Sequence, residues 1–153
     1  MSEEIIPKKT ILNRLKTWVK SQKEPSRASF AFAIIVNIII IYVVNQLPYW
    51  NISFISSSWS QTLWILNLSL IVTIIGNFLF LIYNPQWFRS LIQIVMNIFV
   101  FLAIQTLYTV FPFTLSSTMA LVVVILLLLM MVGVFIATLV EAVKLVASLI
   151  SSD

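Results

Sequence analysis

Charged residues are scarce in this sequence, and cysteine and histidine are absent altogether. Asp, Glu, Lys and Arg make up 9% of the 153 residues, whereas a soluble domain contains about 25%. The absence of Cys excludes disulfides, thiolate zinc sites and iron–sulfur clusters, and the absence of His removes the commonest ligand of haem, copper and zinc. We therefore expect neither a cofactor nor a metal site.

The sequence also has few acidic residues, which many catalytic sites need. The five acids are Glu3, Glu4, Glu24, Glu141 and Asp153. Catalysis in a membrane needs a nucleophile with a base, a metal, or carboxylates that face a cavity, and the sequence assembles none of these. It predicts that the chain is not an enzyme. The one acid beside an apolar span, Glu141, can pair with Lys144 at a helical spacing of three.

Hydrophobic residues account for 61% of the chain and gather in four long runs. The runs cover residues 28–47, 63–83, 87–110 and 118–140, and each approaches or exceeds the roughly 20 residues that cross the hydrocarbon of a bilayer. A secretory signal peptide fits the first run poorly, because the run is too long and no small-x-small site follows it. The fold class expected is all-α: an integral membrane antiparallel four-helix bundle, formed by residues 28–153 with a helical extension at 141–151.

Short breaks separate these runs. Asn84 and Pro85 form a tight turn between the second and third runs. Asn84 is a candidate N-cap of the third helix, and Pro85 a candidate first-turn residue, because proline is tolerated where no backbone donor is needed.

The segment before the first run, residues 1–27, is basic and contains seven of the nine Lys and Arg residues. Apolar residues recur in it at helical spacing, which predicts a basic amphipathic helix on the membrane surface. A disordered basic tail is the alternative interpretation. The partner indicated by this charge is anionic lipid rather than nucleic acid, because the basic residues lie beside an apolar span. The candidate lipid-headgroup contacts are Arg14, Lys16, Lys20, Lys23 and Arg89.

Small and polar residues form rows within the apolar runs, mostly spaced four apart, which places each row on one ridge of a helix. The carboxamides in these rows are Asn37, Asn77, Gln93, Asn97 and Gln105. The favoured interpretation is that they form hydrogen bonds between helices. The alternative is that they line a hydrated path for a small polar or ionic solute.

Two functions therefore remain open. The first is a non-catalytic membrane protein, a small structural or accessory subunit that interacts with other membrane proteins or anionic lipids. The second is a small oligomeric channel or transporter lined by Asn and Gln. Either further copies of the chain or another membrane protein could serve as partner. The location expected is a bacterial or archaeal plasma membrane.

Orientation in the membrane follows from the basic residues. The N-terminal segment, the turn from Asn84 to Arg89 and the C-terminal tail hold all nine, and the other two loops hold none. By the positive-inside rule both termini are cytoplasmic.

A reporter fused after Asp153 should therefore report cytoplasm, and one inserted near Ser57 should report the opposite side. An external signal from the C-terminal fusion would refute four spans with this orientation.

Overall fold

The computed structural model describes residues 13–14, 17, 21 and 25–150, and its regular elements are helical. The elements are α2 (Arg27–Gln46), the short 3-10 helix η1 (Leu47–Trp50), α3 (Trp59–Ile82), α4 (Gln86–Val110) and α5 (Ser117–Ile150). The four α-helices are each long and apolar enough to cross a membrane. The prediction of an all-helical chain with four such helices is confirmed.

The predicted surface helix lies mostly outside the described residues. Lys16, Lys20 and Lys23 are among the residues that are not described, while Arg14 is helical and exposed. The amphipathic helix in residues 1–27 therefore stays a prediction.

Local sequence signals begin and end the helices. The hydroxyl of Ser26 accepts a hydrogen bond from the backbone N–H of Ser29 at 3.2 Å and so caps α2, as serine commonly does. The N-cap of α4 is Pro85, so the prediction that Asn84 caps this helix is wrong: Asn84 lies one residue too early. At the other end of α4, Phe111 takes the left-handed conformation (φ 42°) and turns the chain away from the helix axis.

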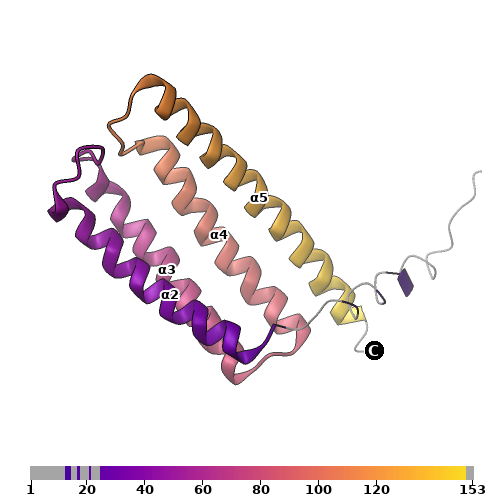
Figure 1. Ribbon diagram of the computed structural model, residues 1–153. Helices are drawn as coiled ribbons and strands as arrows, with labels where there is room; N and C mark the ends of the chain where they lie inside the picture. Colours follow the sequence, from indigo (N-terminus) through magenta and orange to yellow (C-terminus); the bar gives the residue numbers. More distant parts are fainter. Residues whose placement is uncertain (1–12, 15–16, 18–20, 22–24, 151–153) are drawn as a thin grey trace, which may run out of the picture.

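The four helices pack one against the next in the order of the sequence and form a curved layer. Helix α3 packs against α2 and α4, and α5 packs against α4. Figure 1 shows α2 and α5 at opposite edges of this layer, with the loops that join consecutive helices at alternating ends. Among the described residues, α2 and α5 do not pack against each other as the neighbouring helices do. A closed antiparallel bundle therefore stays a prediction.

The main apolar core joins the first three helices. Phe30 of α2, Phe80 of α3 and Met96 of α4 are buried together, and the ring centroids of Phe30 and Phe80 are 5.2 Å apart. Helix α2 buries Phe30 alone, and α5 buries just Leu127 and Ala147. The remaining surface of the two edge helices is accessible, as expected where lipid is the solvent.

The loops after α2 and after α4 are fastened to each other. The backbone N–H of Ser56 donates to the carbonyl of Pro112 at 3.1 Å, and that of Thr114 donates to the carbonyl of Phe54 at 2.9 Å. These bonds satisfy backbone groups that no helix pairs. They hold the α2–α3 pair to the α4–α5 pair at this end of the layer.

Gly76 marks a close approach of α3 to α4. A Cβ on Gly76 would clash with the side chain of Met96 and lie 3.1 Å from Cγ2 of Ile92. Gly76→Ala should therefore destabilise the protein by about 1–3 kcal/mol, the usual cost of overpacking. Thermal unfolding in detergent measures this.

Gly133 of α5 is the matched control, because a Cβ there meets nothing within 4 Å. Gly133→Ala should be neutral or stabilising by up to about 1 kcal/mol, since alanine is the better helix former. Equal losses of stability in the two variants would contradict the close packing at Gly76.

Candidate functional site

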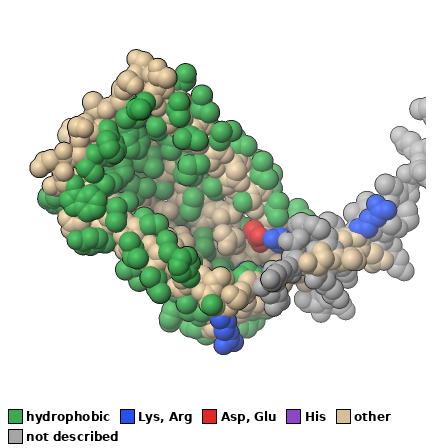
Figure 2. All heavy atoms as spheres, in the orientation of Figure 1, with side chains coloured by type: hydrophobic (Ala, Val, Ile, Leu, Met, Phe, Trp, Pro, Cys, Tyr) green, Lys and Arg blue, Asp and Glu red, His purple; other side chains and the backbone are tan. Residues whose placement is uncertain are grey.

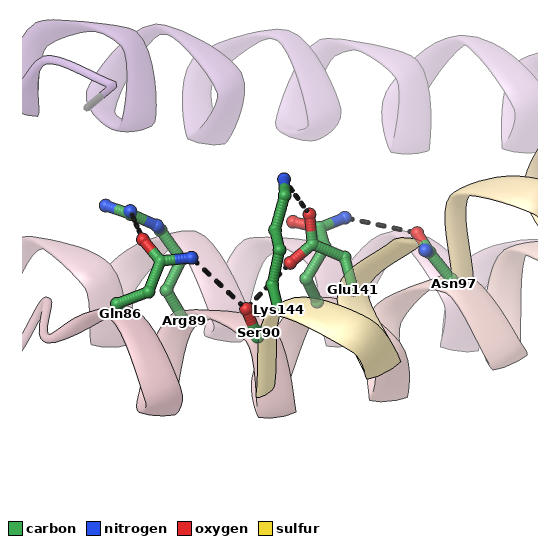
Figure 3. A network of polar contacts seen from close by, with 7 residues as sticks. Gln86, Arg89, Ser90, Asn97, Glu141 and Lys144 are labelled. Atoms are coloured by element: carbon green, nitrogen blue, oxygen red, sulfur yellow. Dashed lines mark hydrogen bonds and ion pairs between the residues drawn. The ribbon is translucent and has the colours of Figure 1, made fainter. Parts of the chain in front are cut away.

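A cluster of polar side chains lies on facing surfaces of α4 and α5, near the turn between α3 and α4. We call it the polar cluster; it consists of Gln86, Arg89, Ser90, Gln93, Asn97, Glu141 and Lys144. Its α4 members recur every three or four residues, so they lie on one face of the helix. Figure 3 shows the labelled members projecting from α4 and α5 on the side that faces α2.

Glu141 is the centre of the cluster and the one acidic residue in the described part of the chain. Lys144 donates to its Oε1 at 2.7 Å, and the hydroxyl of Ser90 donates to its Oε2 at 2.8 Å. The predicted pairing of Glu141 with Lys144 is thus confirmed. The side chain of Glu141 is only 16% exposed. A charge on such a buried side chain must be paired. The bond to Ser90 also ties α5 to α4.

The carboxamides of the cluster form hydrogen bonds with other residues of α4. Gln86 donates to the hydroxyl of Ser90 at 3.4 Å, and Gln93 donates to Oδ1 of Asn97 at 3.1 Å. The Nδ2 of Asn97 is buried and makes no hydrogen bond with the described residues. Because a buried donor without an acceptor costs free energy, this amide is the incompletely satisfied member of the cluster.

Arg89 carries a positive charge that no described carboxylate neutralises. Its guanidinium donates to Oδ1 of Asn84 at 3.3 Å and to Oε1 of Gln86, and both acceptors are neutral amides. The ion pair among the described residues joins Lys144 to Glu141 instead. The polar cluster therefore has a net charge of about +1 from these three ionised groups.

A cavity of about 160 Å³ lies beside the cluster. Side chains from all four helices or their ends line it: Pro25, Phe30, Phe80, Gln86, Arg89, Gln93, Glu141 and Lys144. Figure 2 shows the molecule hollowed on this face, with apolar side chains around the hollow and a red acidic side chain at one end. Glu141 is the acidic residue of the described part of the chain. We call this hollow, between α2 and α5, the lateral groove.

The other predicted carboxamides make no described hydrogen bond with the cluster. Asn37 donates to the carbonyl of Ala33 at 2.7 Å, and Asn77 donates to that of Thr73 at 2.8 Å, so each bonds to its own helix. Gln105 is exposed. Of the five candidates, the structure brings together Gln93 and Asn97.

A second carboxamide pair, which the sequence analysis missed, joins α2 to α3. Asn45 donates to Oδ1 of Asn67 at 2.7 Å, and Asn67 donates to Oδ1 of Asn45 at 3.0 Å. Next to this pair, Nε1 of Trp59 donates to the carbonyl of Val44 at 3.0 Å. Asn67 has no polar residue four positions away in either direction. It therefore belongs to none of the rows of polar residues. Its place near the same loop as Asn45 was the available signal.

Comparison with known proteins assigns the chain to no family: no family model, curated protein or solved structure matches it. The chemistry of the polar cluster is therefore the guide to function. It combines a carboxylate that accepts from two donors with a guanidinium that pairs with no carboxylate of the described residues. Such an arrangement suits the binding of an anion better than proton transfer.

The bond between Ser90 and Glu141 can be tested by stability. Ser90→Ala removes a hydrogen bond to a charged acceptor, so it should lower the free energy of unfolding by about 1.5–3 kcal/mol. Thermal unfolding of the purified protein in detergent provides the measurement.

The control is Ser60→Ala, at an exposed residue whose hydroxyl donates to the carbonyl of Ser57 at 3.1 Å. That change should stay within about 0.5 kcal/mol of the parent. A Ser90→Ala variant as stable as the control would show that Glu141 does not need this donor.

Proposed function

We propose that the chain is a non-catalytic multi-pass membrane protein, a small accessory or structural subunit that binds other membrane proteins or anionic lipids. The observation that carries this proposal is the open side of the helix layer. Helices α2 and α5 do not close over α3 and α4, and a polar cluster lies in the lateral groove between them. A four-helix bundle that stands alone usually fills its own interior, so this layer is suited to a membrane-embedded partner.

The setting that we propose is a bacterial or archaeal plasma membrane, with the helices antiparallel and both termini in the cytoplasm. The support is the distribution of Lys and Arg, which places the polar cluster on the cytoplasmic side. Large apolar side chains on the edge helices are well exposed, for example Phe32 (68%) and Leu129 (62%). Such surfaces face lipid or the apolar helices of a partner.

No catalytic activity is part of the proposal. Glu141 has both carboxylate oxygens occupied, by Ser90 and Lys144, which favours a role in fixing α5 on α4. A general base needs a carboxylate that can reach the proton it removes.

A small channel or transporter is the alternative function. One observation favours it: the Nδ2 of Asn97 is buried with no partner among the described residues, next to Gln93, which lines the cavity. Water in a path between protomers would satisfy this donor. Against it, Asn37 and Asn77 bond to their own helices, which leaves fewer carboxamides to line a path.

Asn97→Leu separates the two functions. If Asn97 serves packing, the change deprives Gln93 of its acceptor, at about 1 kcal/mol. Removal of the Asn97 amide, which has no described acceptor, offsets part of this cost, so stability in detergent should fall by less than about 1 kcal/mol. We expect this loss, together with no flux of small ions above that of empty liposomes for the parent or the variant. Gln105→Leu, at an exposed carboxamide of the same helix, is the control and should change neither quantity.

Two results would overturn the accessory-subunit proposal. One is a solute flux by the reconstituted parent chain that Asn97→Leu blocks while stability stays normal, as dewetting of a path would produce. The other is purification of the chain from its native membrane with neither a stoichiometric membrane protein nor retained anionic lipid.

A further inference from the structure

The feature that points to a specific ligand is the charge balance of the cavity. Three ionised groups line it: Arg89, Lys144 and Glu141. Lys144 forms an ion pair with Glu141 at 2.7 Å, and Ser90 occupies the other carboxylate oxygen. The carboxylate is therefore already engaged, and no carboxylate of the described residues pairs with Arg89.

The geometry of Arg89 leaves donors for a ligand. A guanidinium has five N–H groups, and the two described bonds of Arg89 go to the neutral oxygens of Asn84 and Gln86. Those bonds orient the guanidinium without neutralising it. A planar guanidinium pairs in bidentate fashion with phosphate oxygens, and Gln93, on the same wall of the cavity, carries a carboxamide as a further polar group.

The surroundings of the cavity are apolar and open sideways. Pro25, Phe30 and Phe80 form its other walls, and the lateral groove continues from it between α2 and α5 (Figure 2). Arg89 lies in the first turn of α4, which places it near the end of a helix long enough to span a bilayer. A basic pocket near the ends of membrane-spanning helices is suited to lipid headgroups.

We propose that this cavity binds the phosphate of an anionic phospholipid through Arg89, with the acyl chains of that lipid lying in the lateral groove. The inference rests on the proposed function and names the ligand of its groove. A phospholipid matches both halves of the site, because its phosphate meets a guanidinium that no described carboxylate pairs with, and its chains cover apolar walls. Free phosphate matches the charged half alone.

The first test uses the parent chain. The full-length protein is purified, delipidated in detergent and titrated with phosphatidylglycerol or with diacylglycerol of the same chains, and bound lipid is counted by native mass spectrometry. We expect one saturable phosphatidylglycerol per chain, and diacylglycerol at least about tenfold weaker because it lacks the phosphate. Equimolar inorganic phosphate should not displace the lipid.

The second test removes the charge. Arg89→Gln should weaken phosphatidylglycerol binding about tenfold, and Arg89→Lys should fall between it and the parent, because lysine keeps the charge but loses the fork. Arg27→Gln is the matched control: Arg27 is an exposed basic residue at the start of α2 and does not line the cavity. It should bind like the parent. Circular dichroism verifies that each variant is helical.

Three results would overturn the inference. They are equal binding of phosphatidylglycerol and diacylglycerol, complete displacement by inorganic phosphate, and equal weakening by Arg89→Gln and Arg27→Gln. The first two need no variant, so they decide the matter even if Arg89→Gln fails to fold. A chain that co-purifies with a protein partner but does not distinguish the two lipids would refute the phosphate site and leave the accessory function standing. Solute flux by a chain that binds phosphatidylglycerol more tightly than diacylglycerol would refute the accessory function and leave the phosphate site standing.

Discussion

The carboxylate of Glu141 must be compensated, and the arrangement of α4 and α5 depends on how this is done. Glu141 lies on a helix whose other residues are almost all apolar, where an unpaired charge is costly. Lys144 supplies the opposite charge from the next turn, and Ser90 supplies a donor from α4. The second bond fixes the rotation of α5 about its axis, because only one face of α5 can present Glu141 to Ser90. The position of α5 in turn defines one wall of the lateral groove.

Different contacts hold the helices together at the two ends of the layer. At the end with the two longer loops, backbone hydrogen bonds join residues 54–56 to residues 112–114, and the pair Asn45–Asn67 joins α2 to α3. At the other end, the Ser90–Glu141 bond joins α4 to α5 and Phe30 packs on Phe80. Between these ends α2 and α5 stay apart. An open side with a charged end is the physical basis for expecting a ligand from the membrane itself.

The sequence predicted part of the site and missed the rest, for reasons that particular residues show. The pair Glu141–Lys144 could be predicted because residues three apart share a helix face. Gln93 and Asn97 could also be placed together, since their spacing of four puts them on one ridge of the helix. The bond from Ser90 to Glu141 crosses 51 positions, and no periodicity within one helix reveals which residue of another helix it meets. For the same reason Asn67 was passed over, and Asn37 was not distinguished from carboxamides that bond beyond their own helix.

The helical class of the chain, and the presence of four helices long and apolar enough to cross a membrane, could be predicted from the sequence. These properties follow from composition and run length, which act locally along the chain. The packing of the helices was needed to show that the layer is open between α2 and α5, and that Arg89 faces a cavity walled by Phe30 and Phe80. Such features depend on the rotation and spacing of helices relative to one another. Those are fixed by long-range contacts, such as Gly76 against Met96, that leave no periodic mark on the sequence.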